Sequence, residues 1–109
     1  MANGTIKKSL PSKIFVYDVS VDYEMGATFW SDNLKALLSQ YATVADSLVV
    51  LNVSDSSGRC YCFTISCVNS HYFKVRILSY YGNTNEIREI EKNGTSWKKI
   101  VYTGTATTF

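Results

Sequence analysis

The sequence is poor in the residues from which most catalytic sites are built. It has one histidine, three cysteines and one proline among 109 residues. A predicted turn separates Cys67 from His71, so a Cys–His nucleophile pair is geometrically allowed, but nothing in the sequence supports one. A carboxylate pair is sought among Asp18, Asp22 and Glu24, which look like a solvated strand end. The six glycines lie mostly at turns or in the terminal arms and form no phosphate loop. We therefore expect no catalytic residues, no cofactor and no enzymatic activity.

The cysteines also argue against a disulfide framework or a metal centre. Their number is odd, so the thiols cannot all pair within one chain. With His71 they give the spacing C-x-C-x4-C-x3-H, but structural zinc usually takes its cysteines from tight knuckles, and neither pair has that spacing. Cys60 and Cys62 fall on one face of a predicted strand and Cys67 on the other. We expect no metal site, and thiols that behave as small apolar side chains.

Charge and long apolar runs are scarce as well. A net charge of +2 is too small to argue for nucleic acid. Tyr72, Lys74 and Arg76 share one strand face, but the glycine-and-aromatic signature of an RNA-stacking sheet is missing. The longest apolar run, residues 48–51, is far too short to span a membrane. The N-terminal stretch lacks the apolar region of a secretory signal. We expect synthesis in a cytosol, without membrane insertion or nucleic-acid binding.

Aromatic residues, by contrast, are abundant. They make up 14% of the chain and include eight tyrosines. Such a surplus is typical of β-rich domains, and also of surfaces that bind by stacking and hydrogen bonding. The length suits one domain with a real core. Residues 1–13 are polar and contain the proline, so we interpret them as an N-terminal arm or linker and residues 14–109 as a single domain.

Apolar periodicity predicts most of the elements. A first strand is expected over residues 14–21, more apolar on its odd-numbered face. Residues 48–53 are continuously apolar, which predicts a central strand buried on both faces. Residues 55–58 read Asp-Ser-Ser-Gly and match a type I turn. The stretches 60–68 and 71–81 alternate between apolar and polar residues, as half-buried strands do.

One segment, residues 27–42, has helical periodicity. Its apolar stripe consists of Trp30, Leu34, Leu37, Leu38 and Tyr41. Ser31 or Thr28 is the expected N-cap, and Asp32 suits the positive end of the helix dipole. This stripe is expected to cover a sheet face.

The last part of the chain predicts a β-hairpin around Asn93-Gly94, the dipeptide that favours a type I′ turn. With those two residues as the whole loop, the pairs are Ile90–Trp97, Ile87–Ile100, Arg88–Lys99 and Glu89–Lys98. A longer loop through Ser96 pairs Glu91 with Lys98 instead; we favour the short loop. The elements together predict an α+β fold: an antiparallel β-meander of about five to six strands with one amphipathic helix packed on one face.

The hairpin sequence EIREIEKNGTSWKKIV resembles the closing hairpin of many bacteriophage tail-fibre and receptor-binding tip domains, including the pyocin knob-like ones. The matching residues are Asn93, Gly94, Thr95, Trp97, Lys98, Lys99 and Ile100. The preceding order of elements is also similar, so the resemblance covers about residues 14–102. A second Trp close to Trp97, common in that group, is absent here. The resemblance implies a virion structural module, commonly a homotrimer, whose tip contacts a host surface glycan or protein. Other virion proteins would be reached through the N-terminal arm.

Aromatic and amide side chains near the hairpin are the candidate ligand-binding residues, because sugar rings stack on aromatic faces and loops on a rigid scaffold often carry function. These candidates are Tyr80, Tyr81, Asn83, Asn85, Trp97 and Tyr102. The alternative for Trp97 is that it covers the core. Three other functions stay open: a capsid decoration or head-fibre protein, a monomeric carbohydrate-binding module, and a small inhibitor of a host protein.

Overall fold

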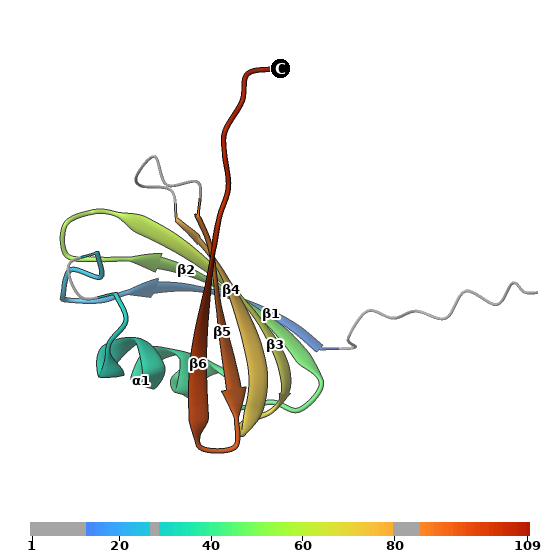
Figure 1. Cartoon of the computed structure of the whole chain (residues 1–109). Coiled ribbons are helices and arrows are strands. Elements are labelled where there is room, and N and C mark those ends of the chain that lie inside the picture. Colours follow the sequence, from blue (N-terminus) through green and yellow to red (C-terminus); the bar gives the residue numbers. More distant parts are fainter. Residues whose placement is uncertain (1–12, 27–28, 80–85) are drawn as a thin grey trace, which may run out of the picture.

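The computed structural model describes residues 13–26, 29–79 and 86–109, which form a six-stranded sheet and one helix. The elements are β1 (Lys13–Ser20), α1 (Asp32–Tyr41), β2 (Ser47–Ser54), β3 (Cys60–Asn69), β4 (Tyr72–Ser79), β5 (Glu86–Asn93) and β6 (Ser96–Thr103). The strands lie across the sheet in their order along the chain. Figure 1 shows a strongly twisted sheet with α1 on one side, and residues 104–109 extending away from its body. The α+β class predicted from the sequence is confirmed.

The sheet is mixed rather than wholly antiparallel. From β2 to β6 each strand pairs antiparallel with the next, as a meander does. The prediction is wrong for β1, which pairs parallel with β2, with Val16 opposite Val50. A parallel neighbour needs a crossover of roughly a dozen residues or more. The segment between β1 and β2, which contains α1, provides that crossover.

One face of the sheet, which we call the core face, builds the hydrophobic core. Its buried side chains are Val49, Leu51, Val53, Tyr61, Phe63, Ile65, Cys67, Phe73, Val75, Ile77 and Ile90. Leu34, Leu37 and Leu38 of α1 are buried in the same cluster. Each large aliphatic side chain buried there contributes about 1.5–3 kcal/mol before entropy costs. The alternation predicted for β3, with Tyr61 to Cys67 on one face, is confirmed.

The other face, which we call the open face, retains substantial exposure. Ile14 and Val16 of β1 are 54% and 64% exposed. Leu48 and Val50 are half-buried, and Asn52 is exposed. The predicted burial of β2 on both faces is therefore wrong. The continuous apolar run comes from core residues alternating with aliphatic residues that remain partly accessible.

The helix is shorter than the predicted segment 27–42. It begins at Asp32, because Ser31 is extended and its hydroxyl accepts a hydrogen bond from the Leu34 amide at 3.4 Å. Ser31 is thus the N-cap, one of the two expected; Thr28 lies outside the described residues. Trp30 precedes the helix instead of belonging to its stripe, which is a correction to the sequence interpretation.

The β5–β6 hairpin has a different register from the one favoured on sequence. Asn93 pairs with Ser96, so the loop is Gly94-Thr95, and Glu91 lies opposite Lys98. Of those two loop residues only Gly94 has positive φ, at 65°, as the first central residue of a type II′ turn does. The type I′ loop at Asn93-Gly94 is therefore wrong, whereas the alternative Glu91–Lys98 pairing is right. A shift of two residues leaves every side chain on the same face.

Candidate functional site

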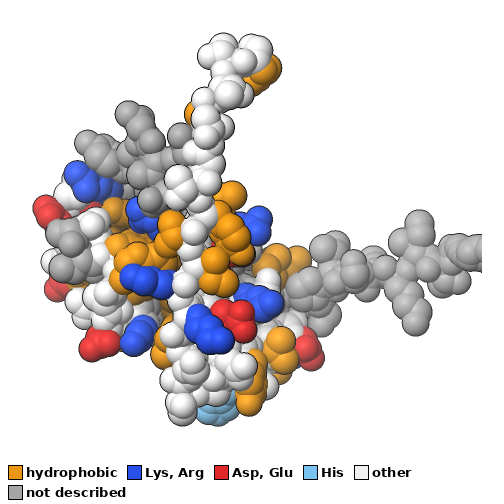
Figure 2. Space-filling model, viewed as in Figure 1, with side chains coloured by type: hydrophobic (Ala, Val, Ile, Leu, Met, Phe, Trp, Pro, Cys, Tyr) orange, Lys and Arg blue, Asp and Glu red, His pale blue; other side chains and the backbone are white. Residues whose placement is uncertain are grey.

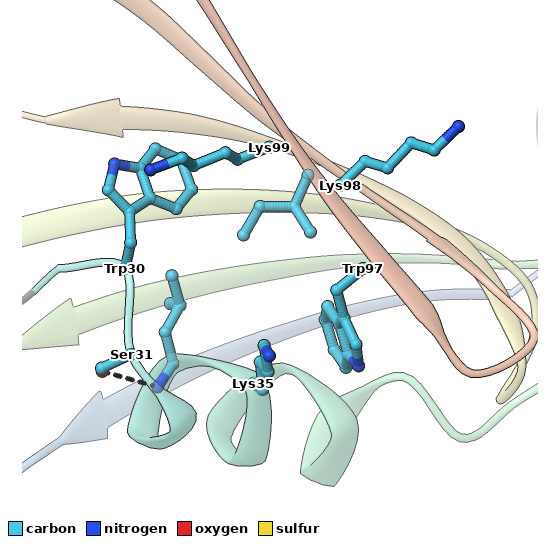
Figure 3. Close-up of a pocket in the computed structure, with 8 residues that line it drawn as sticks. Trp30, Ser31, Lys35, Trp97, Lys98 and Lys99 are labelled. Atoms are coloured by element: carbon cyan, nitrogen blue, oxygen red, sulfur yellow. Dashed lines mark hydrogen bonds between the residues drawn. The ribbon is translucent and has the colours of Figure 1, made fainter.

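A groove of about 280 Å³ lies between the start of α1 and the β5–β6 hairpin (Figure 3). Its size is close to the lower end of the roughly 300–1,000 Å³ usual for small-molecule sites. Trp30 and Trp97 stand at its two ends, and Lys35 projects from α1 between them. The buried side chains of Leu34 and Ile90 also line it. We call this the Trp30–Trp97 groove.

Trp30 is held at the groove by the residues on either side of it. Phe29 is buried in the core, and the Trp30 ring meets it edge-on with centroids 5.0 Å apart and an interplanar angle of 87°. The N-cap Ser31 then starts the helix, which turns Leu34 toward the core and leaves Lys35 exposed. Edge-to-face packing is a favoured aromatic geometry. The indole is therefore positioned by a buried neighbour while remaining only partly buried itself.

Trp97 both covers the core and lines the groove. It is partly buried against the core cluster and meets Phe73 edge-on at 5.5 Å and 79°. Lys92, its partner on β5, places its ammonium 5.4 Å from the centroid of the Trp97 ring. The two interpretations offered by the sequence, core cover and ligand contact, are thus compatible at this residue.

Cationic side chains are gathered on the core face of the hairpin. The Lys99 ammonium lies 5.2 Å from the centroid of Trp30, and the Arg88 guanidinium lies 5.1 Å from that of Phe29. Figure 2 shows Lys and Arg side chains among apolar ones around this part of the molecule. Lys98 also borders the groove, but its side chain points away from it (Figure 3). The mouth of the groove therefore combines indole rings with positive charge.

The candidate residues named from the sequence do not come together in one described site. Tyr80, Tyr81, Asn83 and Asn85 lie outside the described residues. Trp97 faces the groove, but Tyr102 belongs to the open face because residues an odd number apart on a strand point to opposite sides. Its hydroxyl donates a hydrogen bond to Glu89, which raises the pKa of Tyr102 above its usual value of 10.

The contact between Trp30 and Lys99 was not predicted from the sequence. Sequence periodicity places Trp30 within a helical stripe, and the sequence assigns Lys99 to the matching motif and to a position opposite Arg88. Strand alternation does place Trp97 and Lys99 on one face of β6. No sequence signal, however, indicates that this face meets the residue before the helix. That contact depends on how α1 packs beside the sheet.

The thiols occupy separate positions on β3. Cys60 and Cys62 alternate with the buried residues and face the open side, whereas Cys67 is buried on the core face. Burial raises the pKa of the Cys67 thiol, outweighing a hydrogen bond with Ser47 that lowers it. In the described ranges, no three His, Cys, Asp or Glu side chains gather closely enough to hold a metal ion.

The chain matches no protein-family model, no curated protein and no solved structure. Within the described part of the chain, no helical segment has the length and apolar character needed to cross a bilayer.

Proposed function

We propose that this chain is a non-enzymatic glycan-binding module, a virion structural protein of the kind that forms receptor-binding tips on bacteriophage tail fibres. The observation that carries the glycan part is the Trp30–Trp97 groove, with an indole at each end. The virion part rests on the resemblance of the C-terminal hairpin to tail-fibre tips.

The chemistry of the groove suits a sugar. The C–H face of a pyranose ring is apolar and stacks on an aromatic ring, while its hydroxyls need hydrogen-bond partners. Trp30 and Trp97 provide the aromatic surfaces, and Lys35 and Lys99 provide donors beside them. Both indoles are supported from the core side by Phe29 and Phe73, so little ordering is needed when a ligand arrives.

The test is a glycan-array screen of the full chain, followed by titration calorimetry on each glycan that binds. Trp30→Ala and Trp97→Ala are expected to weaken binding about tenfold or more, a loss of roughly 1.4 kcal/mol or greater. Because Trp97 also covers the core, Trp97→Phe is measured in parallel, and every variant is first checked for a cooperative thermal transition.

Tyr102→Ala is the matched control, since it removes an aromatic ring from the opposite face of the same strand. Its binding should stay within about twofold of the unchanged chain, a difference well under 1 kcal/mol. The glycan proposal fails if the array shows no bound glycan, or if folded Trp30 and Trp97 variants bind as the unchanged chain does.

A second candidate is a structural subunit that assembles with copies of itself. The observation that favours it is the edge strand β1, where Ile14, Val16 and Tyr17 are 54%, 64% and 39% exposed. An edge strand presents unpaired backbone groups, and apolar side chains on it favour pairing with another chain. In the tail-fibre interpretation the assembly is a homotrimer, and the N-terminal arm attaches it to other virion proteins.

A further inference from the structure

We infer that the Trp30–Trp97 groove takes an acidic glycan, whose carboxylate, phosphate or sulfate group is bound by Lys35 and Lys99 while a sugar ring stacks on an indole. This inference rests on the proposed glycan binding and adds the charge of the ligand to it. It is carried by the distribution of charges over the two faces of the β5–β6 hairpin.

Strand alternation separates the charges of the hairpin. On the open face, Glu89 and Glu91 lie opposite cations of the neighbouring strands. The Arg76 guanidinium is 3.3 Å from the Glu89 carboxylate, and Lys98 is directly across from Glu91. Two carboxylates thus lie opposite the three cations Lys74, Arg76 and Lys98, which lowers the net positive charge of that face.

On the core face the cations have aromatic partners. Lys99 lies over the Trp30 ring, and Lys92 lies over the rings of Trp97 and Phe73, at 5.4 and 5.7 Å from their centroids. A ring quadrupole attracts an ammonium group but does not neutralise it. Lys92 also donates to the Ser70 carbonyl at 3.2 Å and lies outside the groove lining, whereas Lys99 lines the groove and its full charge is available to an anion that enters it.

Lys35, whose side chain projects into the groove, has an acidic neighbour on its own helix. Its ammonium is 3.8 Å from the Asp32 carboxylate, and the two side chains are 49% and 102% exposed. An exposed ion pair of this kind contributes little and is readily exchanged. Lys35 projects from α1 between the two indoles (Figure 3), so a ligand acid that replaces Asp32 would lie beside the sugar-stacking surfaces.

The acid-binding and stacking groups are thus parts of the same surface. Lys99 Nζ is within 5.2 Å of the Trp30 ring centroid, so one ligand can contact both residues at once. Charge-assisted hydrogen bonds from an ammonium are stronger than those between neutral groups. We expect the groove to prefer an acidic sugar to its neutral counterpart by about tenfold at low salt.

The experiment is titration calorimetry of the full chain against two matched pairs of probes. The first pair is oligogalacturonides and their methyl esters; the second is phosphorylated and unmodified maltooligosaccharides. Preference for the acidic member of either pair supports the inference, and the preferred pair shows which acid is recognised. The preference should shrink as salt rises from about 50 to about 500 mM, because exposed charges are screened.

Matched lysine variants provide the internal control. Lys99→Gln and Lys35→Gln should each remove most of the acidic preference, and Lys99→Arg should restore it. Lys74→Gln, which removes the same charge from an exposed position of β4 outside the groove lining, should leave the preference unchanged. Equal binding of acidic and neutral probes, or equal losses for Lys74→Gln and Lys99→Gln, overturns the inference.

The two proposals fail in distinguishable ways. Neutral glycans bound on the array through Trp30 and Trp97, without an acidic preference, leave the proposed function standing and refute the acidic ligand. An array with no bound glycan refutes both.

Discussion

Asp55 joins the β2–β3 turn to the segment that follows β1. Its Oδ1 accepts hydrogen bonds from the Ser57 hydroxyl at 2.7 Å and from the amides of Ser57 and Arg59 at 3.0 and 2.9 Å. Oδ2 accepts from the Met25 amide at 3.2 Å. Burial would raise the pKa of this carboxyl, but the four hydrogen bonds outweigh it and hold the pKa below its usual value of 3.8.

We predict that Asp55→Asn lowers the free energy of unfolding at neutral pH, because an amide cannot accept these bonds as a carboxylate does. A carboxyl whose native pKa is depressed stabilises the fold above its unfolded-state pKa and loses that contribution as pH falls through the native pKa. The difference between the two proteins should be constant above about pH 5 and shrink below about pH 3.8. Urea unfolding at a series of pH values measures it. A difference that does not shrink at all between about pH 5 and about pH 2 would mean that ionisation of Asp55 is not its source.

For single residues, the turn and capping preferences of the side chains predicted the local structure well in one place and poorly in another. The Asp-Ser-Ser-Gly turn was predicted from its residues, and the Gly58 amide donates to the Asp55 carbonyl at 3.1 Å as a β-turn requires. Trp30 shows where such reasoning stops. Helical spacing is compatible with more than one N-cap. Because Ser31 is the N-cap, Trp30 precedes the helix and lines the groove instead of belonging to the apolar stripe of the helix.

Among the elements, the β5–β6 hairpin shows what decides a strand register. The predicted and observed registers differ by two residues, so both place Ile90 and Trp97 on the core face. The pattern of buried residues therefore fits both registers equally well, and the conformation of the turn decides between them. The side chains brought opposite one another also favour the observed register, since Glu91 meets Lys98 and the repulsive Arg88–Lys99 pair is avoided.

We therefore predict that Gly94→Ala destabilises the protein by about 1–3 kcal/mol, the cost of holding a residue with a side chain at positive φ. An added Cβ at Gly94 would have no heavy atom within 4 Å, so the cost comes from the backbone alone. Chemical denaturation gives the free energy of unfolding. Thr95→Ala in the same loop is the control and should change it by less than about 0.5 kcal/mol. Equal effects of the two substitutions would contradict the turn assignment.

The parallel pairing of β1 could not be predicted from the periodicity of the sequence. Alternation identified the strand, and its odd-numbered side chains Phe15 and Val19 do pack against the core. A pattern of apolar residues does not, however, encode strand direction. Strand direction follows from the connection: a long crossover that contains a helix allows the two strands to pair parallel. The sequence predicts that helix, but the parallel direction of β1 was not inferred from it.

For the whole molecule, the two edges of the sheet differ in how they are protected. The exposed edge strand β6 carries Lys98 and Lys99, charges of the kind that discourage pairing with another chain. The edge strand β1 has a single lysine, Lys13, and exposes Ile14 and Val16 at 54% and 64%, more than the 37% to 49% of the exposed apolar residues of β6. Its one acidic residue, Asp18, accepts a hydrogen bond from Asn52 at 3.3 Å. Association through β1 is therefore favoured over association through β6.

We predict that the full chain is oligomeric in solution and that Val16→Lys raises the dissociation constant about tenfold or more. A lysine there adds charge and removes apolar surface from a strand edge. Light scattering coupled to size exclusion, over a range of concentrations, measures the mass. Ile100→Lys places the same change on the open face of β6, where Ile100 is 37% exposed, and should leave the mass unchanged. A trimer would agree with the tail-fibre interpretation, whereas a chain that stays monomeric at high concentration would exclude β1 as an assembly edge and leave the groove as the function of a monomeric module.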